Sequence, residues 1–205
     1  MLTMALFAFG LAGCSPPWVV VMQTTPDPFV NAPRFSVLPT DFTGLQITTE
    51  MFANLNDESE PEAVFLSKKT VEEQHYFAAN KAAINEEFVK QLVMLTHNAD
   101  IDVVLGTGPA DAPFQIHPSI KRIRHGIDGM LGYQTEVRMT LRITTPDGRV
   151  LDEIAMTHGS LYSGDGHAMA FVRGANPSES RLRGDGKWLA NYATRYLKTR
   201  VHPDK

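Results

Sequence analysis

Seven histidines and a short Ser–Asp–His stretch are the residues of this sequence whose types could support catalysis or metal binding. None of the histidines stands in His-Glu-x-x-His or in another spacing typical of metal ligands, so we expect no metal site. Ser163, Asp165 and His167 lie together, but a nucleophilic triad needs a defined spatial arrangement, and the sequence has no Gly-x-Ser-x-Gly elbow. We therefore predict no catalytic residue, no cofactor and no enzymatic activity.

Two further patterns do not indicate a cofactor site or a catalytic site. Gly106 and Gly108 follow an apolar run, as in a dinucleotide-binding fingerprint, but the third glycine position is Asp111 and a Pro-containing loop follows instead of a helix. Asp152 and Glu153 are neighbours on an expected strand, and successive strand residues point to opposite faces. These two carboxylates therefore do not form a paired acid–base site.

Cys14 is the only cysteine of the chain, which excludes an internal disulfide and a cysteine-based zinc or iron–sulfur site. It follows an apolar stretch, residues 1–13, that carries no charge and ends in Ala12 and Gly13. This layout is typical of a secretory signal peptide with a small-residue cleavage site. The stretch is shorter than the roughly 20 residues that span a bilayer.

Leu11-Ala12-Gly13-Cys14 resembles the lipobox of bacterial lipoproteins, Leu-[Ala/Ser]-[Gly/Ala]-Cys. The resemblance implies that residues 1–13 are removed, that the Cys14 thiol carries diacylglycerol, and that the new amino terminus is acylated. Two or more acyl chains anchor a protein stably. Ser15 stands where an Asp favours inner-membrane retention in enteric bacteria, so the resemblance implies the outer membrane, with the domain facing the periplasm.

The leader departs from a typical signal peptide because no Lys or Arg precedes Cys14. Either the true start lies upstream or the leader is atypical. A buried thiol in an apolar N-terminal segment is the alternative to lipidation.

Length and charge limit the classes of partner. Removing residues 1–13 leaves 205 − 13 = 192 residues, enough for one domain with a good core. The net charge of −4, from 19 basic and 23 acidic side chains, argues against a nucleic-acid partner because such proteins present a concentrated basic face.

Residues 14–33 combine the anchor with a Pro-rich tether that we expect to lift the domain off the membrane. The apolar run Trp18-Val19-Val20-Val21-Met22 interrupts it and has strand propensity. We interpret this run as a docking segment or an edge strand, because prolines lie on both sides of it.

The domain should begin with a short buried strand, Phe35-Ser36-Val37-Leu38, followed by a loop over 40–57 that leaves room for one more short strand. Ser59 with Glu62 and Thr70 with Glu73 are capping-box pairs. An amphipathic helix should run from Thr70 to about residue 96, and its start near residue 60 or a break near residue 67 stays open. Its apolar face is formed by Phe77, Ile84, Phe88, Leu92 and Leu95.

The second half should be mainly strands. We expect a buried strand over 101–106 and an irregular strand over 114–127, in which Pro118 indicates a break or bulge and a position at a sheet edge. Strict alternation of apolar and polar residues over 135–157, with a turn at Pro146-Asp147-Gly148, predicts a hairpin with one buried face. A loop over 159–176 and a helix from about residue 177 should follow, with 201–205 fraying.

These elements predict one α+β domain over 34–200: a mainly antiparallel sheet of about four to five strands with two helices packed on one face. Phe35-Ser36-Val37-Leu38-Pro39, Asp102-Val103-Val104-Leu105-Gly106 and the segment 145–151 then resemble small bacterial lipoproteins with a periplasmic β-α-β-β-α domain. That domain is similar to the amino-terminal domain of TolB and to the periplasmic domain of the curli-secretion lipoprotein. The resemblance implies an accessory role in envelope assemblies.

We therefore expect a non-enzymatic, membrane-anchored lipoprotein that binds an envelope protein or assembles with itself. The alternative is a ligand-binding or transport-accessory lipoprotein with a small-molecule or lipid site near residues 159–176. Lys121, Arg122 and Arg124 either contact anionic headgroups or a protein, or simply protect a solvated edge strand from pairing.

Overall fold

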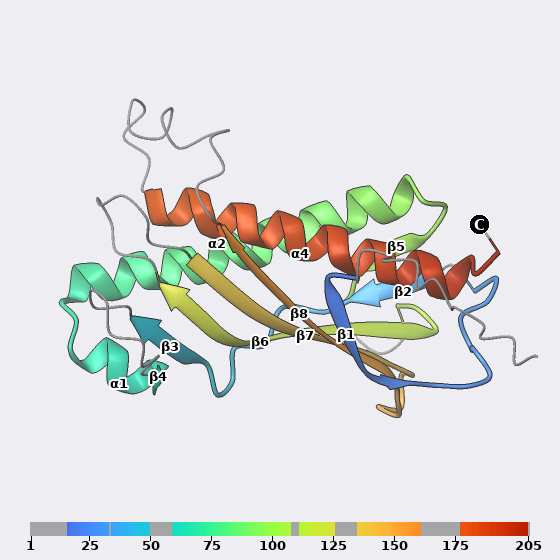
Figure 1. Ribbon diagram of the computed structural model, residues 1–205, viewed down its shortest axis with the longest axis horizontal. Helices are drawn as coiled ribbons and strands as arrows, with labels where there is room; N and C mark the ends of the chain where they lie inside the picture. Colours follow the sequence, from blue (N-terminus) through green and yellow to red (C-terminus); the bar gives the residue numbers. More distant parts are fainter. Residues whose placement is uncertain are drawn as a thin grey trace, which may run out of the picture.

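The chain folds around one mixed β-sheet covered on one face by two long helices (Figure 1). The computed structural model describes residues 16–32, 34–49, 59–107, 111–125, 135–160 and 177–204. Within these residues the strands are β1 (Trp18–Gln23), β2 (Arg34–Val37), β3 (Gln46–Thr49), β4 (Ser59–Pro61), β5 (Asp102–Leu105), β6 (Phe114–His125), β7 (Thr135–Thr144) and β8 (Val150–Ser160). The helices are α1 (Glu62–Ser67), α2 (Val71–His97) and α4 (Pro177–Val201).

Among the described residues the sheet has eight strands, in the order β1-β8-β7-β6-β2-β5, with β3 also pairing with β6 and β4 pairing with β3. The α+β class is confirmed, but the expected four to five mainly antiparallel strands are wrong. β2 runs parallel to β5 and β6, and β3 runs parallel to β6. The chain between β2 and β5 contains α2, and a helical crossover between neighbouring strands returns the chain in the same direction.

β6 lies inside the sheet, so the edge position expected from Pro118 is wrong. β7 pairs along one side of β6, while β2 and β3 pair with the two ends of its other side. Pro118 falls in the gap between β2 and β3, where Asp41 donates its N–H to the Pro118 carbonyl and accepts the N–H of Ile120. A proline is tolerated there because no strand requires its missing N–H.

The helices begin and end for local reasons. Thr70 and Glu73 form the predicted capping box at the start of α2, with each side chain accepting the other residue's backbone N–H. The helical region is broken, since α1 ends at Ser67 before α2 begins. The capping box expected at Ser59 is wrong: Ser59 belongs to β4, and Pro61 is the N-cap of α1.

α2 and α4 lie side by side across one face of the sheet, as predicted (Figure 1). The apolar stripe of α2 is buried at Phe77, Ile84, Phe88 and Leu92. The predicted hairpin is confirmed as β7 and β8, whose alternate residues Val137, Met139, Leu141 and Ile143 are fully buried or nearly so. The turn between them holds Gly148 at φ 87°, a left-handed conformation that glycine adopts without strain.

Folded structure extends into both ranges expected to lie outside the domain. β1 pairs with β8 within the expected tether, and Phe29 is completely buried in the core. At the other end, α4 continues through Val201, which is buried and whose carbonyl accepts the N–H of Asn31. Among the described residues, no helix is long and apolar enough to cross a membrane.

Candidate functional site

The residues that the sequence singled out for lipidation and catalysis lie outside the described part of the chain. Cys14 belongs to residues 1–15, and Ser163, Asp165 and His167 belong to residues 161–176. The lipidation of Cys14 therefore stays a prediction. Among the described residues, no group of His, Cys, Asp or Glu side chains could hold a metal ion. The first described strand, β1, begins four residues after Cys14.

β1 is an edge strand whose apolar side chains are largely uncovered. Among the strands that the structure describes, β8 is the one that pairs with it. Val19, Val20, Val21 and Met22 are 68%, 45%, 58% and 40% exposed. Trp18, at the start of the strand, packs edge-on against Tyr196 of α4 with ring centroids 6.0 Å apart. Contiguous exposed apolar residues of this kind mark interaction sites.

The side of β1 that faces away from β8 is suited to pairing with another strand. An edge strand presents unpaired N–H and C=O groups, to which an extended segment of another chain can add as a further strand. The only irregularity is a bulge between Val20 and Met22, where the register against β8 shifts. Lys, Arg, Asp, Glu and Pro are all missing from Trp18–Gln23. The strand therefore lacks the charges that usually prevent such pairing.

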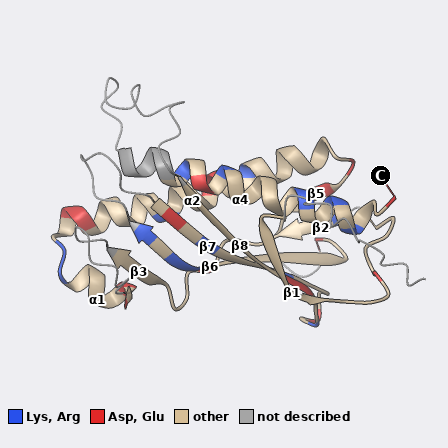
Figure 2. Cartoon of the chain, in the orientation of Figure 1, with Lys and Arg blue, Asp and Glu red and all other residues tan. Residues whose placement is uncertain are grey.

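The face of the sheet opposite the helices is charged. Arg122 on β6 lies directly opposite Arg138 on β7, and Arg138 donates to Glu136 at 2.8 Å. Arg124 lies 3.9 Å from the same Glu136 carboxylate. Basic positions on β6 are visible in Figure 2. Because β6 is an interior strand, the protection of a sheet edge does not explain Arg122 and Arg124. The carboxylate of Glu136 neutralises part of the positive charge on this face.

A hollow of about 290 Å³ opens on this charged face. Its charged groups are paired, because Lys121 lies 3.5 Å from Asp41 and Arg142 donates to Glu153 at 2.8 Å. Hydrogen bonds from Thr43 lower the pKa of Asp41 to about 2. Partial burial, followed by the charge of Arg142, lowers the pKa of His117. The paired charges leave little unneutralised charge for an ionic ligand.

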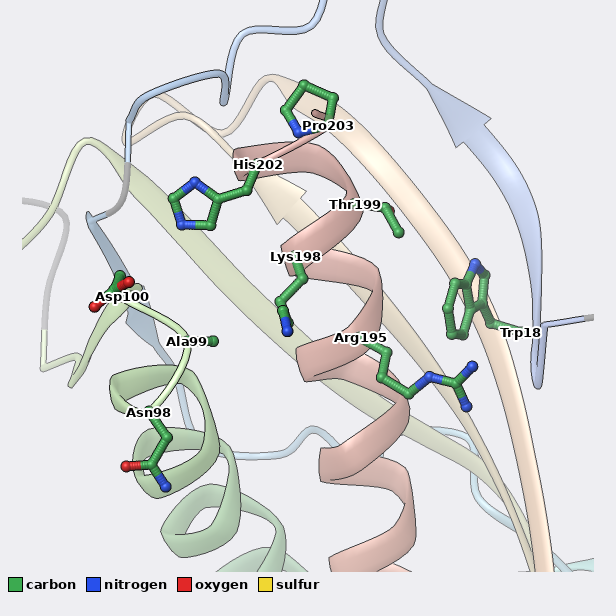
Figure 3. A pocket seen from close by; sticks show the side chains of 9 residues that line it. All are labelled: Trp18, Asn98, Ala99, Asp100, Arg195, Lys198, Thr199, His202 and Pro203. Atoms are coloured by element: carbon green, nitrogen blue, oxygen red, sulfur yellow. The ribbon is translucent and has the colours of Figure 1, made fainter. Parts of the chain in front are cut away.

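A larger hollow of about 490 Å³ lies where the ends of α2 and α4 meet β1 (Figure 3). Arg195 and Lys198 of α4 line it, and the Arg195 guanidinium lies 5.7 Å from the centre of the Trp18 ring. Asp100 supplies one carboxylate. Two helix C-termini also bring partial negative charge to this end, which basic side chains offset. The hollow is thus an open, mixed-charge surface beside the edge strand.

A buried ion-pair network holds β1 and the segment after it in place. Asp152 of β8 is fully buried and accepts from Arg200 Nε at 2.8 Å, Tyr196 Oη at 2.5 Å and the Thr24 N–H at 2.9 Å. Arg200 also donates to the Thr24 carbonyl at 2.9 Å and pairs with Asp27. β1 is therefore held against α4 at both of its ends. Trp18 packs against Tyr196 at the start of the strand, and Arg200 donates to the carbonyl of Thr24 just after its end.

A second, partly buried cluster joins the end of β8 to α4. His158 Nδ1 is 2.9 Å from Tyr192 Oη, and its Nε2 is 3.8 Å from the carboxylate of the fully buried Asp185. The His158 ring stacks on Trp188, which is 51% exposed. Burial lowers the pKa of His158 and raises the pKa of Tyr192. Thr135 donates to Asp185 at 2.7 Å.

The sequence contained one signal for the first network and none for the second. Asp152 stands in the apolar register of Val150, Ile154 and Met156, which places a carboxylate on the buried face of β8. The expectation that Asp152 and Glu153 point to opposite faces is confirmed, since Glu153 pairs with Arg142 on the open face. His158 and Asp185 meet only through tertiary packing.

No family model matches this chain, and no curated protein matches it. Solved structures with a similar arrangement include a PelC dodecamer from Paraburkholderia phytofirmans, with 11% identity, TM-score 0.41 and coverage of 90% of this chain and 98% of that chain. A DUF330 protein from Xanthomonas campestris has 8% identity, TM-score 0.43 and coverage of 87% and 94%. A minor lipoprotein from Acinetobacter baumannii has 8% identity, TM-score 0.37 and coverage of 83% and 93%. Values this low assign neither a family nor a function to this chain.

Proposed function

We propose that this chain is a bacterial lipoprotein, anchored to the outer membrane through acyl chains on Cys14, that acts without catalysis as an envelope interaction or assembly factor. The observation that carries the interaction role is the edge strand β1, with four consecutive apolar side chains between 40% and 68% exposed. An edge strand of this composition is expected to pair with protein. The lipobox supports the anchor and the site of action.

The anchor is tested by palmitate labelling and membrane fractionation of the wild type and Cys14→Ala. We expect the wild type to incorporate label and to sediment with outer membranes, and the variant to lose both properties, because the acyl chains on Cys14 are the proposed anchor. Label that persists in Cys14→Ala, or membrane association that does not change, would contradict the anchor.

The interaction surface is tested by a photo-crosslinking side chain at Val19 in intact cells. Val71, the first residue of α2, is the matched control because it is 67% exposed, against 68% for Val19. We expect defined crosslinked proteins from position 19 and none from position 71. Equal capture from both positions would show that exposure alone explains the crosslinks.

The cluster around His158 supports a second candidate, a ligand-binding lipoprotein. An exposed Trp188 ring stacked on a half-buried histidine, with a buried carboxylate and a partly buried phenol beside it, has the mixture of apolar and polar groups found in ligand sites. Native mass spectrometry of the protein released from envelopes tests this role. A bound small molecule or lipid that is lost in Trp188→Ala would favour it, and identical bare masses would reject it.

A further inference from the structure

The partner that best fits β1 is a strand with the same properties as β1. Val19 and Val20 precede the bulge, so their side chains point to opposite faces of the sheet, and their exposure means that both faces are uncovered near this edge. A strand added here must therefore be apolar on both of its faces. Residues 16–25 carry no charged side chain, so nothing in β1 attracts a charged partner segment.

We propose that two copies of this chain pair through β1, antiparallel and about a two-fold axis that lies midway between the two strands, level with Val20. This inference rests on the proposed interaction role of the same edge and names its partner. In this alignment Val20 faces its own copy, and Trp18, Val19, Val21 and Met22 lie on either side of that pair, with the bulge between Val20 and Met22 shifting their register. Every one of these cross-strand neighbours is apolar, which is the composition that stabilises paired strands.

The opposite edge of the sheet fits β1 poorly. On that side the sheet ends in β4, which has three residues, and in β5, which has four residues against six in β1. The exposed Asp102 of β5 forms an ion pair with Arg34 at 3.5 Å. A head-to-tail contact between β1 and β5 would place this ion pair beside apolar side chains and leave part of β1 unpaired. A two-fold contact uses the same patch twice and closes on itself.

The distance to Cys14 favours pairing on a membrane. Four residues span at most about 14 Å, so acyl chains on Cys14 would hold β1 of every copy at a similar height above the bilayer. A two-fold axis along the membrane normal leaves both anchors in the same leaflet. Tethering raises the effective concentration to about millimolar. One strand pair buries less than the roughly 1,200 Å² of a stable interface, so pairing in dilute solution should be weak.

Cysteine crosslinking in cells tests the pairing directly, in the full chain with Cys14 retained. Residues directly opposite in an antiparallel pair have Cα atoms about 4.5–5.5 Å apart, within the range of a disulfide. We expect Val20→Cys to form a disulfide-linked homodimer under mild oxidation. Leu105→Cys on β5 and Val71→Cys on α2 are 66% and 67% exposed and serve as controls that should stay monomeric.

Opposite charges test whether the contact is between identical strands. Val20→Lys or Val20→Glu alone should reduce co-purification of two differently tagged copies from membranes at least tenfold, because like charges meet at the axis. Co-expression of the Lys and Glu variants should restore it. Since Val20 is 45% exposed, both variants should keep the wild-type circular dichroism and melting temperature.

The outcomes separate the inference from the proposed function. If Val20→Cys and the Val19 photo-crosslinker capture only a different protein, self-pairing is overturned and the interaction role of the edge stands. If Leu105→Cys crosslinks to Val20→Cys, the two-fold arrangement is overturned in favour of a head-to-tail one. If neither probe captures any protein, both the self-pairing and the interaction role of β1 fail.

Discussion

At the residue scale, Arg200 has the largest predicted effect on stability. Its guanidinium is nearly buried, and it is bonded to Asp152, Asp27 and the Thr24 carbonyl. We predict that Arg200→Ala lowers the free energy of unfolding by about 3–5 kcal/mol, because it leaves the carboxylate of Asp152 buried without its cation. Urea denaturation measures this loss. Lys187→Ala, on the exposed side of the same helix, should change stability by less than about 0.5 kcal/mol, and equal losses in the two variants would contradict the prediction.

Two histidines should make stability depend on pH. Burial lowers the pKa of both His117 and His158 below 6.5, so these side chains take up protons more readily in the unfolded chain. A lowered histidine pKa gives stability that is present above the unfolded pKa and lost as the pH falls below it. We therefore predict that the free energy of unfolding falls between about pH 7 and pH 5.

The histidine prediction is checked by urea titrations at both pH values and by NMR titration of the imidazole signals. His158→Gln should reduce the pH dependence of the free energy of unfolding. An imidazole of His158 that titrates at or above the ordinary histidine pKa would contradict the assigned cause.

The structural role of a single residue could be predicted from the sequence only where residues close to it in the chain determine that role. The Thr70–Glu73 capping box needs only neighbours three residues apart, and the structure confirms it. Asp152 could be recognised as buried from the alternation of β8, but its cation comes from Arg200, 48 positions away. Such a partner depends on how α4 lies across the sheet, and periodicity does not encode that arrangement.

At the element scale, two glycines of α4 give opposite predictions. A Cβ on Gly186 would lie 2.8 Å from the Ile84 carbonyl oxygen of α2, so Gly186→Ala should push the two helices apart and destabilise the protein. A Cβ on Gly184 would meet nothing within 4 Å. Gly184→Ala should therefore raise the free energy of unfolding by about 0.5–1 kcal/mol, through helix propensity alone. Thermal unfolding of both variants checks the pair, and shifts in the same direction would contradict the close packing of α2 and α4.

Long elements with a repeated apolar pattern could be predicted from the sequence. Short strands that form only by pairing with a neighbouring strand could not. α2 and the β7–β8 hairpin carry repeated apolar spacing, and both appear as expected. β3 and β4 have four and three residues, and β3 exists as a strand because it pairs with β6. The edge expected at Pro118 was wrong because tolerance of proline depends on which neighbouring strand needs the missing N–H, and the sequence does not show that neighbour.

At the scale of the whole molecule, the proposed self-pairing should depend on the membrane. We predict that the Cys14→Ala protein is monomeric at about 10 μM in analytical ultracentrifugation, because an isolated strand pair is a small interface. The acylated protein reconstituted in vesicles should give the Val20→Cys homodimer at the same total concentration. A strong dimer of Cys14→Ala in solution would show that the contact is larger than one strand pair.

The fold class could be predicted from the sequence, but the full arrangement of the strands could not. One α+β domain with two helices on one face follows from the alternation of β7 and β8 and the stripe of α2. The parallel strands escaped prediction because direction depends on the path of the chain between them. The candidate interaction surface was partly visible as the run from Trp18 to Met22, but its exposure on both faces required the sheet order.

Intact mass spectrometry of the protein isolated from cell envelopes tests the central claim most directly. We predict a chain that begins at Cys14 and carries the added mass of a diacylglyceryl group on its thiol, with a further acyl chain on its amino group. A free Cys14 thiol still joined to Gly13 would contradict the anchor and the site of action proposed for this chain.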